Sequence, residues 1–178
     1  MRTPTLALVL GLTFACDSAD EATAESSPQP ASAEENSSPQ PDAASAFSEY
    51  QRKSMRAEAM VSGRMIADLL RVMVSNGETP ASIPVTPPPG SCCKQDKGVC
   101  PIDDGSWSDP AWKALGFSPT APHRYSFGVD VDGSKVSVTA TADLDCDGTL
   151  STYTYEGTIA DGDIDFGDYE AVETNPLD

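Results

Sequence analysis

Apolar residues occupy every second position between Tyr125 and Leu144, with one break at Asp132 and Gly133. Side chains two positions apart share one face of a β-strand, so this alternation predicts two strands, each with one buried face. An Asp-Gly pair between alternating runs is typical of a tight hairpin turn. Residues 150–159 alternate as well and predict a third strand. The acidic tail beyond them allows either an edge strand around residues 164–166 or a solvated tail.

Residues 47–77 carry apolar or small side chains at helical spacing, which predicts one long amphipathic helix. Ser45 or Ser48 is expected to cap its start, and Asn76 with Gly77 to end it. Six residues are expected to form the apolar stripe: Tyr50, Ala57, Val61, Met65, Leu69 and Val72. Five are expected on the solvent side: Arg52, Lys53, Arg56, Glu58 and Arg64. The predicted fold class is α+β, with this helix packed on a small antiparallel sheet.

Proline, cysteine and turn-forming residues dominate residues 78–105, which predicts an extended loop without regular structure. Disulfides would have to order such a loop. Beyond it, Asp109 followed by Pro110 predicts a helix start and Gly116 a helix stop, so residues 109–115 are expected to form a short helical turn.

The first sixteen residues combine Arg2, an apolar run from Leu6 to Phe14, a small Ala15 and then Cys16. This pattern predicts an export signal, and the run is too short to span a bilayer as a helix. It resembles a bacterial lipoprotein signal, which implies a signal peptide at residues 1–15 and a lipid on Cys16. The alternative is an ordinary signal peptide cleaved nearby. The lipid would anchor the exported protein in the cell envelope of a bacterium with two membranes.

Residues 17–46 contain no aromatic and no basic residue, and the sequence SSPQP occurs in them twice. Such a composition cannot bury a core and predicts disorder. Residues 16–46 are therefore expected to form a lipid-anchored acidic stalk, and residues 47–178 the globular domain.

Four cysteines remain if Cys16 carries lipid: Cys92, Cys93, Cys100 and Cys146. In an exported chain, four cysteines predict two disulfides. A bond between the adjacent Cys92 and Cys93 would strain the backbone. Two connectivities stay open, and each ties Cys146 to one of these two residues. A zinc site would prefer spaced cysteine pairs and usually histidine, and the chain has a single histidine, His123.

The stretch DLDCDGTLS, residues 143–151, places aspartates at positions one, three and five of a calcium loop, with Gly148 at the turn. The candidate metal ligands are Asp143, Asp145, Asp147, Thr149 and Ser151. The glutamate at position twelve of a helical EF-hand is missing, which excludes that motif. Three interpretations stay open: a looser Ca²⁺ site in a hairpin, a hairpin held by a disulfide, or an aspartate-rich turn.

The formal charge of −17, from 28 acidic and 11 basic residues, argues against a nucleic-acid-binding protein. The sequence contains no glycine-rich phosphate loop, no metal-binding histidine pair and no redox CxxC motif. His123 is the only imidazole, and a lone histidine of this kind is more often a loop or strand-edge residue. These observations predict a protein that is not an enzyme.

Four segments carry a family resemblance: a helix beginning YQRKSMRAEA, then WKALGFSP, RYSF, and an alternating strand into DLDCDGTLS. In this order, residues 47–159 resemble the soluble head domain of a type IV pilin or pseudopilin. The resemblance implies a long helix packed across an antiparallel sheet. Related heads often have DLDGDG, so Cys146 at a glycine position implies an added disulfide to the Cys92/Cys93 loop.

The pilin leader, its peptidase site and the long apolar helix half have no counterpart in this sequence. The resemblance thus implies a pilin-like head on a lipid tether rather than a normal filament subunit. Its expected partners are the membrane, through Cys16, and envelope, pilus or secretion proteins. The alternative functions are a calcium-dependent binding or adhesion module and, third, a periplasmic hydrolase that would use His123.

Overall fold

The computed structural model describes residues 43–102 and 105–176, with side chains from residue 46 onward. The predicted signal peptide, Cys16 and the stalk up to residue 42 lie outside the described residues. Within the described ranges, no helix has both the length and the hydropathy that a membrane crossing requires.

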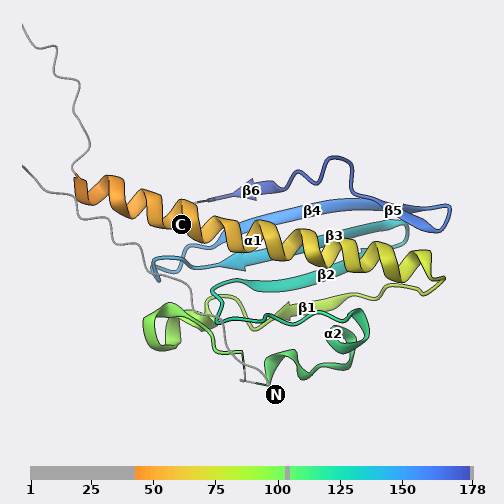
Figure 1. Cartoon of the computed structure of the whole chain (residues 1–178), viewed down its shortest axis with the longest axis horizontal. Helices are drawn as coiled ribbons and strands as arrows, with labels where there is room; N and C mark the ends of the chain where they lie inside the picture. Colours follow the sequence, from red (N-terminus) through yellow and green to blue (C-terminus); the bar gives the residue numbers. More distant parts are fainter. Residues whose placement is uncertain (1–42, 103–104, 177–178) are drawn as a thin grey trace, which may run out of the picture. The chain divides into compact units, whose positions relative to one another are not determined.

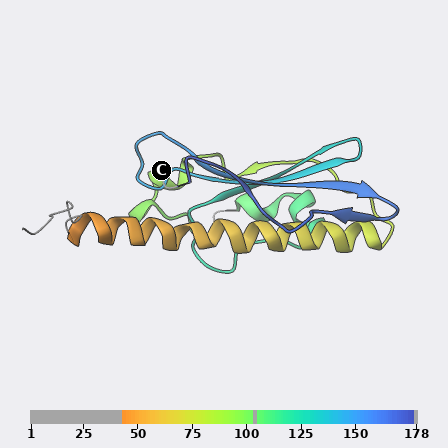
Figure 2. The same ribbon diagram turned by 90° about the horizontal axis from the view of Figure 1, so that it is seen from above.

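The domain is a mixed α+β structure in which the long helix α1, Ala43–Ser75, lies along one face of an antiparallel sheet (Figures 1 and 2). Five strands follow one another across the sheet in sequence order, and β6 pairs with β4 beside β5. The strands are β1 Ile83–Thr86, β2 Ser126–Asp132, β3 Lys135–Ala142, β4 Ser151–Ala160, β5 Asp163–Asp165 and β6 Val172–Thr174.

The period-two pattern is confirmed in the central strands. Asp132 pairs with Lys135 across the β2–β3 turn, and Gly133 takes a positive φ of 59°, which suits glycine in a tight hairpin. The predicted third strand is β4, and of the two alternatives left open for residues 164–166, β5 at Asp163–Asp165 matches the edge strand. Alternate residues of β3 and β4, including Val138 and Tyr155, are fully or almost fully buried beneath the helices.

Two strands, β1 and β6, were not predicted from the sequence. The loop expected without regular structure contains β1, so that expectation was wrong. This strand has four residues and includes Pro84, which an edge strand tolerates because one side of its backbone needs no partner. Two short 3-10 turns follow in the same region, at Ser91–Lys94 and Asp96–Gly98, and a third lies just beyond it at Ser106–Ser108. β6 lies in the acidic tail and pairs with the first half of β4.

Helix α1 begins at Ala43, four residues before the predicted start, so both predicted caps, Ser45 and Ser48, lie within the helix. The sequence AASA at residues 43–46 favours the extension because alanine has the highest helix propensity. The helix ends at Ser75, and Gly77 takes a φ of 82°, so the predicted stop at Asn76 and Gly77 is confirmed.

The predicted apolar stripe of α1 was wrong: five of its six residues are exposed, and Leu69 is half-buried. The stripe that contacts the sheet lies on the other side of the helix and consists of Ala59, Gly63, Ile66, Ala67, Leu70 and Val74. Small residues are needed on this side of the helix because the side chains of β4 that face it are bulky. A Cβ atom on Gly63 would lie 2.4 Å from Cε2 of Tyr155.

The prediction that Arg52, Arg56 and Glu58 face solvent was also wrong, because all three are half-buried, and Arg56 and Glu58 bind the sheet region. The guanidinium of Arg56 pairs with the carboxylate of Glu173 on β6. Oε1 of Glu58 accepts hydrogen bonds from the backbone N–H groups of Arg124, at 2.8 Å, and Tyr125, at 3.0 Å. These side chains fix the rotation of α1 about its own axis.

The short helix α2, Pro110–Leu115, confirms the predicted helical turn. Oδ1 of Asp109 accepts the N–H of Ala111 at 2.7 Å, as an N-cap should, and Gly116 ends the helix with a φ of 78°. The neighbouring aromatic side chains form one packed group with β2: Trp107, Trp112, Phe117 and Phe127. This group and the buried stripe of α1 belong to one core.

Candidate functional site

The loop between β3 and β4 brings together three aspartates predicted as metal ligands. The carboxylates of Asp143, Asp145 and Asp147 each offer an oxygen atom, and these atoms lie within 4.8 Å of one another. Asp143 is half-buried, and the other two are exposed. An acidic group of this size and spacing can hold a metal ion, because hard cations such as Ca²⁺ prefer clustered carboxylate oxygens.

Backbone N–H groups of the loop already bind these carboxylates. Asp143 accepts hydrogen bonds from the N–H groups of Asp147, at 3.1 Å, and Gly148, at 3.0 Å. Asp147 accepts the N–H of Thr149 at 2.7 Å, and this bond holds the pKa of the Asp147 carboxyl below its ordinary value. The loop therefore has internal order of its own. Each carboxylate has about four lone-pair sites and keeps capacity for a cation.

The two remaining predicted ligands occupy different surroundings. Thr149 is half-buried, and its N–H is engaged by Asp147. Ser151 is the first residue of β4 and pairs with Ala142; it is fully buried, on the same face as Tyr153. Its hydroxyl points to the interior with that tyrosine, whereas Asp147 is exposed. The aspartates thus supply the accessible oxygens of the loop.

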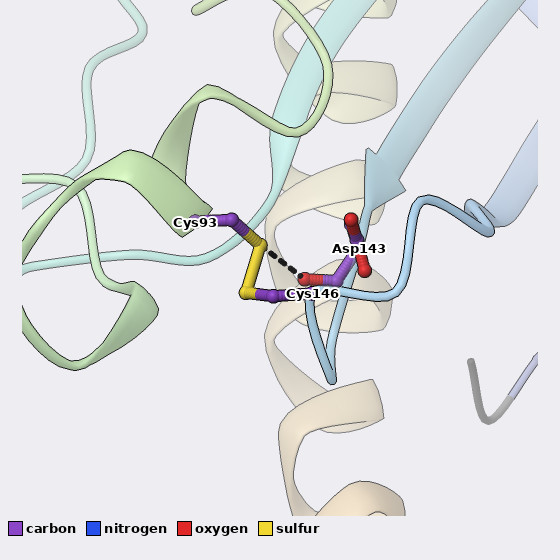
Figure 3. A group of neighbouring side chains, drawn as sticks. All are labelled: Cys93, Asp143 and Cys146. Carbon is purple, nitrogen blue, oxygen red and sulfur yellow. Dashed lines mark hydrogen bonds between the residues drawn. A yellow bond between two sulfur atoms is a disulfide. The ribbon is translucent and has the colours of Figure 1, made fainter.

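The four cysteines of the domain lie in two pairs at disulfide distance. The sulfur atoms of Cys92 and Cys100 are 2.12 Å apart, and those of Cys93 and Cys146 are 2.16 Å apart. This pairing matches one of the two connectivities left open by the sequence. The second pair joins the aspartate loop to the 3-10 turn Ser91–Lys94 (Figure 3).

Asp143 also touches the Cys93–Cys146 pair. Sγ of Cys93 lies 3.1 Å from the backbone carbonyl oxygen of Asp143 (Figure 3). These three residues form a second group close enough to share a metal ion. A sulfur atom in a disulfide offers no thiolate, which is the metal-binding form of cysteine. The oxidised site is therefore an all-oxygen site.

Cys146 has a φ of 64°, in the left-handed region that glycine adopts without steric cost. A glycine would suit this backbone better, whereas cysteine fixes the loop by its bond to Cys93. The disulfide thus stabilises a loop conformation that the side chain at this position disfavours.

His123 connects the cysteine-rich segment to the core. Its backbone exchanges two hydrogen bonds with Cys100, at 2.7 and 3.0 Å. Its ring is 3% exposed: Nε2 accepts from Nε1 of Trp107 at 3.2 Å, and Nδ1 donates to the carbonyl oxygen of Tyr125 at 2.9 Å. Because indole N–H can only donate, the ring proton must sit on Nδ1. The strand-edge placement is confirmed, but the sequence did not reveal that both ring nitrogens are bound.

A separate open groove of about 480 Å³ lies at the opposite end of β3 from the aspartate loop. Asp130, Ser137 and Glu156 face one another across β2, β3 and β4 and form part of its lining. The groove therefore lies on the polar face of the sheet and shares no residue with the aspartate loop.

Comparison with protein-family models gives no match, and comparison with curated proteins and with solved structures gives no significant match. The resemblance to type IV pilin heads stays a prediction.

Proposed function

We propose that this protein is a non-enzymatic, lipid-anchored envelope protein whose pilin-like head is presented to other proteins and is not a normal filament subunit. The observation that carries the proposal is the 33-residue helix α1 lying across an antiparallel sheet. That arrangement is the one implied by the family resemblance of residues 47–159. The lipid on Cys16 and the acidic stalk are the parts of the proposal that rest on sequence alone.

Export is supported by the cysteines. Cys92 pairs with Cys100, and Cys93 with Cys146, so all four cysteines outside the lipoprotein-like signal have a partner. Disulfides persist in the periplasm and at the cell surface and are rare in a reducing cytosol. The pairing therefore agrees with the export signal predicted from the first sixteen residues.

A binding role is favoured over hydrolysis by the state of His123. A general base needs a ring nitrogen that can take a proton from the substrate or from water. Both nitrogens of His123 are engaged within the core, with Trp107 and Tyr125, and the ring is buried. The net charge of −17 disfavours nucleic acid as a partner and leaves envelope, pilus or secretion proteins.

Labelling with a radioactive fatty acid tests the anchor. The wild-type chain should incorporate label and fractionate with membranes, whereas Cys16→Ala should be unlabelled and released as a secreted or periplasmic protein. Thr13→Ala, a change within the same signal, serves as the control and should keep the label. An unlabelled wild type, or label that persists in Cys16→Ala, would refute the anchor.

A second candidate function, a calcium-dependent binding or adhesion module, is favoured by one observation: the clustering of Asp143, Asp145 and Asp147 within 4.8 Å. Such a site would fit Ca²⁺ at the millimolar concentrations found outside cells, since it lacks the bidentate glutamate of tight sites. The disulfide to Cys93 would hold the loop with or without the ion.

Calorimetry with the purified, oxidised chain tests this candidate. Added Ca²⁺ should release or absorb heat and raise the melting temperature, and Asp145→Asn should reduce both effects. Asp132→Asn, at the end of β2 and opposite the first residue of β3, is the matched control and should change neither. If Ca²⁺ gives no heat and no shift with the wild type, the aspartates only shape the turn.

A further inference from the structure

The outward side of α1 carries an apolar ridge that contacts no other part of the described domain's core. We use the name outer ridge for Phe47, Tyr50, Ala57, Val61, Met65 and Val72. Five of these are large and between 49% and 70% exposed. At 100° per residue, the ridge lies about 180° around the helix from the buried stripe that begins at Ala59. Figure 2 shows this helix running along one side of the sheet.

Single exposed apolar residues are normal on protein surfaces and need no explanation. The outer ridge differs because its members follow one another along one line for about 38 Å, from Phe47 to Val72. Ser54 and Asp68 are exposed and lie on the same line, but apolar residues repeated along one helix face in this way mark an interaction site more often than chance exposure does. In the same helix, residues 46–51 are all exposed on every side, so the core does not explain the apolar character of this end.

Five of the six ridge residues are spaced symmetrically about Val61, whereas the position that mirrors Phe47 is Ser75. Ala57 and Met65 lie four residues to either side of it, and Tyr50 and Val72 lie eleven residues to either side. In an antiparallel pair of identical helices, residues equally far from the two-fold axis face each other. An axis at Val61 therefore places Tyr50 against Val72, Ala57 against Met65, and Val61 against its own copy.

The facing residues also complement each other in size. The large Tyr50 would meet the smaller Val72, and the long Met65 would meet Ala57. Alternation of large and small side chains is what allows two helices to interdigitate at a close distance. Symmetric spacing brings complementary residues opposite each other only when the partner helix has the same sequence. The ridge therefore points to a second copy of the chain.

Charge favours the same arrangement. The exposed charged residues on the outward part of α1 are Glu49, Lys53, Arg64 and Asp68, two of each sign, in a chain with a net charge of −17. Two copies can thus approach along α1 without the repulsion expected between their acidic surfaces. An axis at Val61 brings Lys53, eight residues before it, beside Asp68 of the other copy, seven residues after it.

We propose that two copies of this protein pair through their outer ridges as antiparallel helices with a two-fold axis at Val61. Five large side chains on each copy, at roughly 100 Å² each, would bury about 1,000 Å² over the two copies together. This area is near the lower limit for specific interfaces. The dimer is therefore weak and reversible. It would be favoured where an anchor confines copies to one surface and raises their effective concentration.

Sedimentation equilibrium of the full-length chain tests the pairing, with Cys16→Ser to prevent lipidation and a mild detergent present throughout. The wild-type ridge should give a monomer–dimer equilibrium with a Kd of about 100 µM or below. Val61→Glu should weaken it at least about tenfold, because two carboxylates would meet at the axis. The matched control is Val172→Glu on β6, where the valine is 60% exposed, against 63% for Val61. It should leave the equilibrium unchanged, and both variants should melt as the parent does.

Cysteine cross-linking tests the orientation. In the Cys16→Ser chain, Val61→Cys should form a symmetric intermolecular disulfide under mild oxidation. Tyr50→Cys alone should not, because the two copies of residue 50 would be about 33 Å apart, but it should cross-link when mixed with Val72→Cys. Self-cross-linking of Tyr50→Cys would indicate a parallel pair and overturn the proposal. A wild type that stays monomeric at about 1 mM, or that pairs only on added anionic vesicles, would overturn it too.

Discussion

Gly63→Ala is the substitution that most directly tests how α1 is seated on the sheet. Gly63 lies in the buried stripe, and an added Cβ would come within 2.4 Å of Cε2 and 3.0 Å of Cδ2 of Tyr155. The tyrosine has little freedom to move, since it is 1% exposed and its hydroxyl donates to the carbonyl oxygen of Met60 at 3.2 Å. The added methyl group must therefore displace the helix or the ring.

Two opposing effects set the magnitude. Replacing glycine by alanine in an exposed helix stabilises it by about 1 kcal/mol. Overpacking a filled core costs about 1–3 kcal/mol, and the upper part of that range applies here because the ring of Tyr155 is confined. The free energy of unfolding should therefore fall by about 1–2 kcal/mol, and the sign of the change is the opposite of the one expected on an exposed helix face.

Urea unfolding of the oxidised protein, followed by circular dichroism, measures this change. Ser54→Ala, on the exposed side of the same helix, is the control and should leave stability unchanged or raise it slightly. In a Tyr155→Leu background, Gly63→Ala should lose most of its cost, since the shorter side chain leaves room for the methyl group. A rise in stability of about 1 kcal/mol for Gly63→Ala alone would show that the sheet does not bury this face.

Three further predictions concern the contacts around the core. Replacing Cys93 and Cys146 together by alanine should lower the free energy of unfolding, measured by urea unfolding, by about 4 kcal/mol. The bond spans 53 residues, so its loss frees a long loop in the unfolded chain. A decrease of less than about 1 kcal/mol would contradict this account. Glu58→Ala should cost about 2 kcal/mol by leaving two backbone N–H groups without their acceptor, whereas Glu58→Gln, which keeps an accepting oxygen, should cost clearly less. The hydrogen-bonded ion pair with Arg71 holds the pKa of the Asp163 carboxyl below its ordinary value of 3.8. The stabilisation that this ion pair gives the folded protein is therefore present above pH 3.8 and is lost as the pH falls through the lowered pKa. The melting temperatures of the wild type and Asp163→Asn should converge in acid, and a constant difference would refute the assignment.

Hydropathy patterns predicted the strands well because a half-buried strand needs only alternation. Val136, Val138 and Ala140 of β3 are all buried, as their spacing indicated. The cap of α2 was predictable for a similar reason, because Asp109 and Pro110 act within a single turn. Both signals are local and do not depend on what packs against the element.

The rotation of α1 could not be predicted in the same way, because both sides of the helix carry apolar residues. Its larger exposed residues, such as Tyr50 and Met65, gave the stronger hydropathy signal. The sheet, however, fills the interface with tyrosines and leaves room for Ala59 and Gly63. The volume of the sheet side chains that face α1 decided which side of the helix is buried. Those side chains lie about a hundred positions away in the sequence.

The same distinction between local and long-range signals applies to the candidate site. The grouping of Asp143, Asp145 and Asp147 follows from their spacing within one loop and was predictable. The partner of Cys146 was not, because Cys92 and Cys93 are neighbours in the sequence and only the fold distinguishes them. The interior position of Ser151 likewise follows from its place at the start of β4, one residue beyond the loop.

The two disulfides also determine what the chain becomes when it unfolds. Cys92 bonds Cys100 and Cys93 bonds Cys146, so the pairs cross in the sequence and enclose residues 92–146 in a double ring. Heat or urea can release α1 and the C-terminal strands as free ends, but the enclosed segment cannot extend. The oxidised unfolded state is therefore compact, with a smaller dependence of stability on urea than a linear chain of this length would have. Reduction would restore the full dependence, and refolding would then begin from a chain whose dimensions are no longer limited by its own covalent rings.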